Sequence, residues 1–259
     1  MCILFIAVAQ HPKFPLIIAA NRDEFHARPT QISEFWQQPS TLLAGRDLEA
    51  GGTWMGVTRN GRISALTNIR DPKRNVENAV SRGGLVTSYL TSSVSNQRYT
   101  EELIETAEQY NGYNLLFGDI RSLNLSVFNN HTGQSQNMTP GYYGLSNASL
   151  DTPWPKIERG KLALADYCET HQDLYTDALF ALLADQTKAE NHMLPDTGVP
   201  SEWEKQLSSI FIQGETYGTR TSTLLFVDHD ANLFWQEKTF NPSGKETADR
   251  TFEFKIAGE

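Results

Sequence analysis

The chain opens with two apolar segments joined by a short polar turn, in residues 1–24, MCILFIAVAQHPKFPLIIAANRDE. Residues 3–9 and 16–20 are rich in aliphatic and β-branched side chains, which is typical of buried strands. The sequence His-Pro-Lys at 11–13 predicts a hairpin connection between them. We therefore expect an antiparallel strand pair that brings the polar residues 21–24 back to the start of the chain, where Cys2 stands.

Three further strands are predicted before any helix, over residues 42–45, 54–58 and 62–69, with an Asn-Gly turn at 60–61. Five strands ahead of the first helix argue against a doubly wound βαβ fold. Later helices are predicted over 84–92, 99–110, 155–167 and 174–183, and later strands over 114–117, 123–128, 142–145, 221–227 and 233–240. This order predicts an α+β sandwich in a single domain, 1–259, with helices on the outer faces of stacked sheets.

Amino-acid composition and net charge limit the kinds of molecule that the protein can bind. The formal net charge of −9 would repel nucleic acid, so no nucleic-acid partner is expected. Two cysteines in 259 residues indicate a reduced compartment and no disulfide scaffold. The apolar segment 2–9 is too short to span a bilayer and follows no basic region, so we expect no stable membrane insertion and a cytoplasmic location. These features leave the oligomeric state open.

Cys2 has several interpretations. At the start of a strand, a cysteine is usually a small buried hydrophobe. It precedes the apolar segment, which excludes a lipoprotein cysteine, and it occupies the second position, where myristoylation needs glycine. The interpretation with a chemical consequence is a nucleophile that becomes the first residue once Met1 is removed, because its own α-amino group can then accept the thiol proton.

Polar side chains lie at the ends of several predicted strands, where they would meet at a common rim: Arg22, Asp23, Asn68, Asn147 and Arg220. An arginine beside Cys2 would favour the thiolate. The aspartate would hold that cation or orient the amine, and the two asparagines would donate to an oxyanion. Simpler interpretations remain open, namely a turn with a surface ion pair at 21–24 and asparagines that serve as turn or helix-capping residues.

Other motifs are missing from the sequence. The six histidines are scattered without the spacing of metal ligands, so no metal site is predicted. No nucleotide-binding glycine loop and no Gly-x-Ser-x-Gly motif occurs. Residues 191–200 contain two prolines and a glycine, which predicts a surface loop or a lid over a site.

Taken together, the sequence resembles the NRDE family (transport and Golgi organisation protein 2-like), named for the tetrapeptide at 21–24. The resemblance runs from residue 1 to at least residue 228. Besides Met1-Cys2 and NRDE, it rests on GGTW (51–54), ALTNIR (65–70), SRGGLV (81–86), LSN (145–147), DTPWPK (151–156) and YGTRTST (217–223).

The NRDE family is similar in architecture to N-terminal nucleophile (Ntn) hydrolases of the choloylglycine hydrolase and penicillin V acylase group. That similarity implies an αββα four-layer sandwich, with two antiparallel sheets between helical layers. It assigns site roles to Cys2, Arg22, Asp23, Asn68, Asn147 and Arg220. Arg22 and Asp23 are adjacent here, whereas the acylases separate this pair. Neighbouring residues on a strand point to opposite faces, so the sequence leaves open which of the two faces the site.

The resemblance implies two main functions. One is hydrolysis of a non-peptide C–N (amide) bond in a small acylated metabolite, with Cys2 as nucleophile and no cofactor. The alternative is a non-catalytic protein that binds or traffics haem or another hydrophobic ligand, because family members have been linked to Golgi organisation, lipid metabolism and haem mobilisation. His26 is then the candidate haem ligand. A scaffold that acts only through protein contacts is a third hypothesis.

Overall fold

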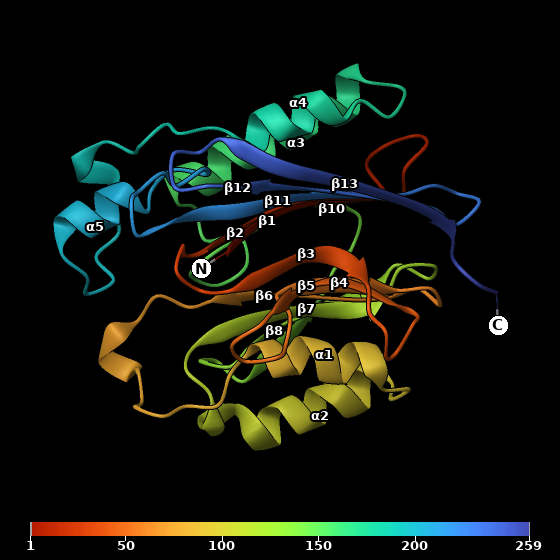
Figure 1. Cartoon of the computed structure of the whole chain (residues 1–259), viewed down its shortest axis with the longest axis horizontal. Helices are drawn as coiled ribbons and strands as arrows, with labels where there is room; N and C mark the ends of the chain where they lie inside the picture. Colours follow the sequence, from red (N-terminus) through yellow and green to blue (C-terminus); the bar gives the residue numbers. More distant parts are fainter. Residues whose placement is uncertain (1, 259) are drawn as a thin grey trace.

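Two antiparallel sheets lie face to face in the computed structural model, which describes residues 2–258 (Figure 1). The first sheet contains, in spatial order, β10 (Gly141–Leu145), β1 (Cys2–Val8), β2 (Leu16–Phe25), β11 (Tyr217–Val227), β12 (Asn232–Phe240) and β13 (Glu246–Lys255). The second contains β3 (Thr30–Phe35), β4 (Leu42–Asp47), β5 (Met55–Thr58), β6 (Arg62–Asn68), β7 (Tyr113–Asp119), β8 (Asn124–Asn129) and β9 (Gln134–Asn137).

Helices cover the outer face of each sheet (Figure 1). The pair α3 (Pro155–Thr170) and α4 (Thr176–Leu183) packs on the first sheet, and α1 (Gly83–Thr91) and α2 (Asn96–Thr106) pack on the second. The remaining helical segments are α5 (Ser201–Gln206) and the 3-10 turns η1 (Pro72–Arg74), η2 (Ala107–Gln109) and η3 (Asn191–Met193). The predicted α+β class and the αββα order of layers are confirmed.

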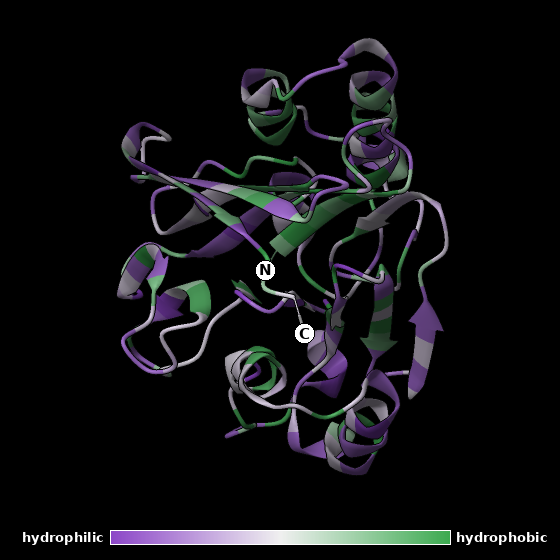
Figure 2. Cartoon of the chain, turned by 90° about the vertical axis from the view of Figure 1, so that its right-hand side faces the viewer, coloured by the Kyte–Doolittle hydropathy of each residue, from purple (hydrophilic) through white to green (hydrophobic). Residues whose placement is uncertain are grey.

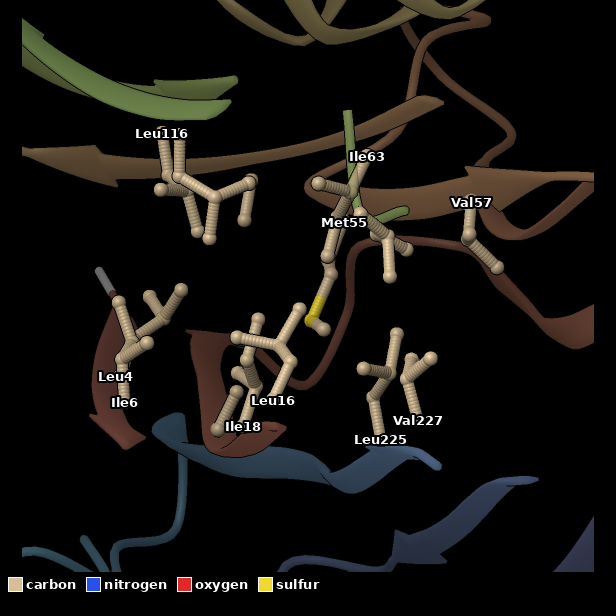
Figure 3. Packing of buried hydrophobic residues seen from close by; sticks show 14 of the residues in the cluster. Leu4, Ile6, Leu16, Ile18, Met55, Val57, Ile63, Leu116, Leu225 and Val227 are labelled. Atoms are coloured by element: carbon tan, nitrogen blue, oxygen red, sulfur yellow. The ribbon is translucent and has the colours of Figure 1, made fainter. Parts of the chain in front are cut away.

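The residues of β1 and β2 are buried on both faces. Their even-numbered side chains, such as Leu4 and Ile18, point between the sheets toward Met55 and Leu116 (Figure 3). Their odd-numbered side chains, such as Phe5, belong to the cluster beneath α3 and α4. The hydropathy colouring of Figure 2 shows apolar strand segments enclosed between helices of mixed character. Burial on both faces explains why these strands are continuous apolar runs without alternation.

The contact between α3 and β1 depends on Gly160, because a Cβ there would lie 2.0 Å from a ring carbon of Phe5. We expect Gly160→Ala to lower the free energy of unfolding by roughly 1–3 kcal/mol, as overpacking in a closed core does. Urea denaturation measures the change. Gly84→Ala is the matched control, since an added Cβ in α1 meets nothing within 4 Å. An equal loss in both variants would contradict this account.

Several elements differ from the sequence predictions. Strand β2 continues through residues 21–24 to Phe25, so the polar tetrapeptide lies within a strand and does not follow one. The strands β3, β9 and β13 and the helix α5 were not predicted. Both β9 and β13 are edge strands with mostly exposed, polar side chains, so they carry no apolar pattern. The expected helix at 99–110 begins earlier, at Asn96, and its last residues form η2.

Candidate active site

Cys2 and Arg22 lie opposite each other in the β1–β2 ladder. Both follow the even-numbered positions that point between the sheets. The Arg22 guanidinium carbon lies 4.2 Å from the centre of the Trp54 ring, and its Nη1 donates to Thr30 Oγ1 at 3.0 Å. Stacking and hydrogen bonding therefore hold a cation on the same face as the Cys2 thiol.

Asp23 lies on the opposite face of β2. Its Oδ1 accepts a hydrogen bond from Thr219 Oγ1 at 2.7 Å, and its main-chain carbonyl accepts one from the Tyr217 hydroxyl at 3.1 Å. Burial raises the pKa of Asp23, while the charge of Lys156 acts in the other direction. Arg22 therefore shares the face of Cys2 and Asp23 lies on the other face of β2, although both residues line the cavity beside Cys2.

A cavity of about 390 Å³ opens beside Cys2. Its lining consists of Cys2, Arg22, Asp23, Glu24, Arg28, Asp47, Glu49, Ala50, Thr53, Trp54, Leu66, Asn68, Ala79, Val80, Ser81, Arg82, Gly83 and Asn111. Four of the six residues assigned to the hydrolase site thus meet around one space. Among residues 2–258, the Asn68 side chain has no hydrogen-bond partner, so its NH₂ group is available to a ligand.

Asn147 does not line the cavity and is buried beneath it. The side-chain Nδ2 of Asn147 donates to the main-chain carbonyl oxygen of Asn68 at 2.9 Å. The main-chain carbonyl oxygen of Asn147 accepts from the backbone N–H of Arg70 at 2.8 Å. These two bonds join the end of β10 in one sheet to the end of β6 in the other. In the structure Asn147 positions Asn68.

Arg220 does not line the cavity beside Cys2. It lies where the β2–β11 register shifts between Thr219 and Thr221, and its Nη1 donates to the carbonyl oxygens of Phe25 at 2.8 Å and Arg28 at 3.1 Å. A β-bulge redirects the side chain of the extra residue. The structure therefore does not bring Arg220 to the cavity, and Thr219, one residue earlier, contacts Asp23 instead.

His26 also lies outside the cavity lining. Its Nε2 is 3.1 Å from the carbonyl oxygen of Gly214, and burial, followed by the charge of Arg220, lowers the pKa of its imidazole. An axial haem ligand needs a ring nitrogen that faces room for the porphyrin. His26 Nε2 is thus engaged by a main-chain carbonyl and the ring does not line the cavity beside Cys2, so the role of His26 as a haem ligand stays a prediction. Within residues 2–258, no three His, Cys, Asp or Glu side chains group as metal ligands would.

Three cations and one acid near the site were given no role in the sequence analysis. Arg82 lines the cavity, and Lys156, Arg70 and Glu204 form a buried charged group behind Asn147. Lys156 Nζ donates to the carbonyl oxygen of Leu207 at 3.0 Å, and burial lowers its pKa to about 7. The stretches 65–70, 81–86 and 151–156 contain the three cations, whereas no sequence pattern indicates Glu204.

Burial raises the pKa of the Cys2 thiol, with Asp23 adding to the effect and Arg22 opposing it. We expect its alkylation by iodoacetamide to accelerate with pH, with a midpoint above the ordinary value of 9.0. Peptide-level mass spectrometry separates it from Cys168, which is 3% exposed with a pKa raised to about 11 and should remain slow. A Cys2 rate that is already constant below pH 8 would contradict this expectation.

Comparison with known proteins places the chain in a family. The family model for Transport and Golgi organisation 2 matches residues 1–242. The chain belongs to this family. It is 34% identical to the human Transport and Golgi organization protein 2 homolog over 99% of both chains, and 28% identical to the Drosophila melanogaster protein over 92% of both.

Solved structures similar to this family member share its fold at low sequence identity. One is the Caenorhabditis elegans ortholog of N-acylethanolamine-hydrolyzing acid amidase, with a TM-score of 0.51 and 10% identity over 86% of this chain and 92% of the other. Another is a mutant of the conjugated bile acid hydrolase from Clostridium perfringens, with a TM-score of 0.51 and 9% identity over 99% and 98%. The chain therefore has the αββα fold of Ntn hydrolases. No helix within residues 2–258 is long and apolar enough to cross a bilayer.

Proposed function

We propose that this protein is an Ntn-type hydrolase that cleaves the amide C–N bond of a small acylated metabolite, with Cys2 as the nucleophile. The observation that carries the proposal is the pairing of Cys2 with Arg22 at the wall of a cavity that also contains the free amide of Asn68. The fold supports it, because two similar structures belong to enzymes named for hydrolysing N-acylethanolamines and conjugated bile acids, which are amides.

The reaction requires the α-amino group of Cys2 to be free. Met1 lies outside the residues that the structure describes, and its removal is part of the proposal. The amine accepts the thiol proton as Sγ bonds to the carbonyl carbon of the substrate. The C–N bond then breaks as the leaving nitrogen takes that proton, which leaves a thioester on Cys2. Water attacks the thioester, releases a carboxylic acid and returns a proton to Sγ.

The surrounding residues have distinct roles in this mechanism. Arg22 offsets part of the cost of forming a thiolate in a buried place. The free NH₂ group of Asn68 stabilises the oxyanion of the tetrahedral intermediate. Asn147 fixes the backbone of Asn68 through its 2.9 Å bond. Asp23, held by Thr219, contributes a negative charge that favours the protonated amine as the proton moves.

Mass spectrometry and acyl-transfer assays together test the proposal. Native protein should lack Met1, and after brief reaction with an activated acyl donor and an acid quench, the Cys2 peptide should carry one acyl group. Cys168→Ala is the matched control and should still be acylated at Cys2. Native protein that retains Met1, or that turns over an N-acyl amide without an adduct at Cys2, would overturn the mechanism. Saturable ligand binding without turnover would support the non-catalytic alternative.

A further inference from the structure

The charged side chains around the cavity are unequally partnered. Arg28 lies 2.8 Å from Asp47 and 2.9 Å from Glu49, so its charge is balanced at the rim. Arg22 lies 4.0 Å from Glu24. These two arginines therefore have carboxylates from the chain itself, and a ligand anion would compete with those carboxylates for them.

Arg82 has no such carboxylate. Among residues 2–258 it forms no ion pair, and the one hydrogen bond of its side chain runs from Nη1 to the carbonyl oxygen of Gly112 at 3.0 Å. A carbonyl is neutral and engages one of the five N–H donors of the guanidinium. Burial lowers the pKa of Arg82, and the charge of Glu24, which forms no ion pair with it, acts in the other direction. The guanidinium is thus a partly buried cation beside the nucleophile.

No carboxylate of residues 2–258 lies within ion-pair distance of Arg82, although Asp23, Glu24, Asp47 and Glu49 line other parts of the cavity. The part of the lining that residues 79–83 and Asn111 contribute carries a single charge, that of Arg82. The first turn of α1, which begins at Gly83, contains no acidic residue. A partly buried cation that forms no ion pair is costly to maintain, and an anionic ligand would supply the missing partner. Trp54, Leu66 and Val80 of the same lining offer apolar contact for a short acyl chain.

We propose that Arg82 binds the carboxylate of the substrate, which makes the substrate a short-chain N-acyl amino acid. This assignment rests on the proposed hydrolase function, because it takes the bound amide to be the one that Cys2 cleaves. The planar guanidinium can hold a carboxylate through two parallel N–H···O bonds. The same amide with a neutral end would leave Arg82 without that partner, so the cavity discriminates by charge.

A matched ligand pair tests the proposal by equilibrium binding. N-Hexanoylglycine and N-hexanoylethanolamine share the acyl group and the amide. They differ at the other end, where the first has a carboxylate and the second has a hydroxymethyl group. On Cys2→Ala protein, isothermal titration calorimetry should show the acylglycine binding about tenfold or more tightly, the size expected for hydrogen bonds to a charged group. Arg82→Gln should abolish the preference, and Arg82→Lys should retain part of it. Arg28→Gln is the control and should keep it.

The outcomes separate this proposal from the hydrolase itself. Equal affinity for the two ligands, no binding of either, or a preference that survives Arg82→Gln in a variant with unchanged thermal unfolding would overturn the role of Arg82. Turnover is then measured with Cys2 intact. Hydrolysis of the acylethanolamine in preference to the acylglycine would leave the hydrolase standing and the Arg82 assignment overturned. A carboxylate preference in binding with no cleavage would leave the Arg82 site standing and overturn the hydrolase.

Discussion

Glu204→Leu is expected to lower the free energy of unfolding by about 3–5 kcal/mol, the usual cost of removing one partner from a buried ion pair. Glu204 is 3% exposed. One carboxylate oxygen accepts from the Arg70 guanidinium, and the other accepts from the backbone N–H and the Oγ1 of Thr197 at 2.9 and 2.6 Å. Without Glu204, Arg70 is left as a buried cation near Lys156. Urea denaturation monitored by tryptophan fluorescence measures the loss.

Two further variants show whether the loss comes from the charge pair. Glu202→Leu changes an exposed acid on the same helix, which forms no ion pair within residues 2–258, and should alter stability by less than about 0.5 kcal/mol. The double variant Arg70→Met with Glu204→Leu removes both charges and should recover much of the lost stability. A double variant as unstable as the sum of the two singles would show that the residues act independently.

The second large effect concerns catalysis. On the proposed mechanism, Cys2→Ala should reduce kcat for an N-acyl amide by a factor on the order of 10⁴–10⁶, as the loss of a covalent nucleophile does. No other cysteine lines the cavity, because Cys168 is in the cluster beneath α3 and α4. The measurement is turnover at saturating substrate, with thermal unfolding to confirm that the half-buried position tolerates alanine. Cys168→Ala should retain turnover. A Cys2→Ala protein with a tenth of the original kcat would point to a different nucleophile.

The fold could be predicted from the sequence in those segments where burial requires a pattern of apolar side chains. The central strands at 3–9 and 16–20 were recognisable because both faces are buried and the segments are apolar throughout. The edge strands β9 and β13 pair with one neighbour each and expose polar side chains. These strands form because their backbones pair with the neighbouring strand of the sheet. Their side-chain composition alone does not indicate that they are strands.

The candidate site was predictable in part for the same kind of reason. Arg22, within β2, and Asn68, at the end of β6, reach the cavity as expected because both lie in regular register with their neighbours. Arg220 lies outside the cavity, where the sequence had placed it, because the β2–β11 register shifts at this residue. The residue types around position 220 do not indicate this shift. Glu204 comes from a one-and-a-half-turn helix whose contact with Arg70 depends entirely on tertiary packing. Such contacts are beyond what residue type and spacing encode.

The position of β1, next to the edge strand β10 of its sheet, also bears on how the protein folds. This strand lies between β2, which follows it directly, and β10, whose residues Gly141–Leu145 are synthesised much later. Its partner β2 in turn needs β11, which begins at Tyr217. Chains emerge from the ribosome slowly compared with local folding. The set of strands around Cys2 is therefore complete only after residues Tyr217–Val227 of β11 have been synthesised.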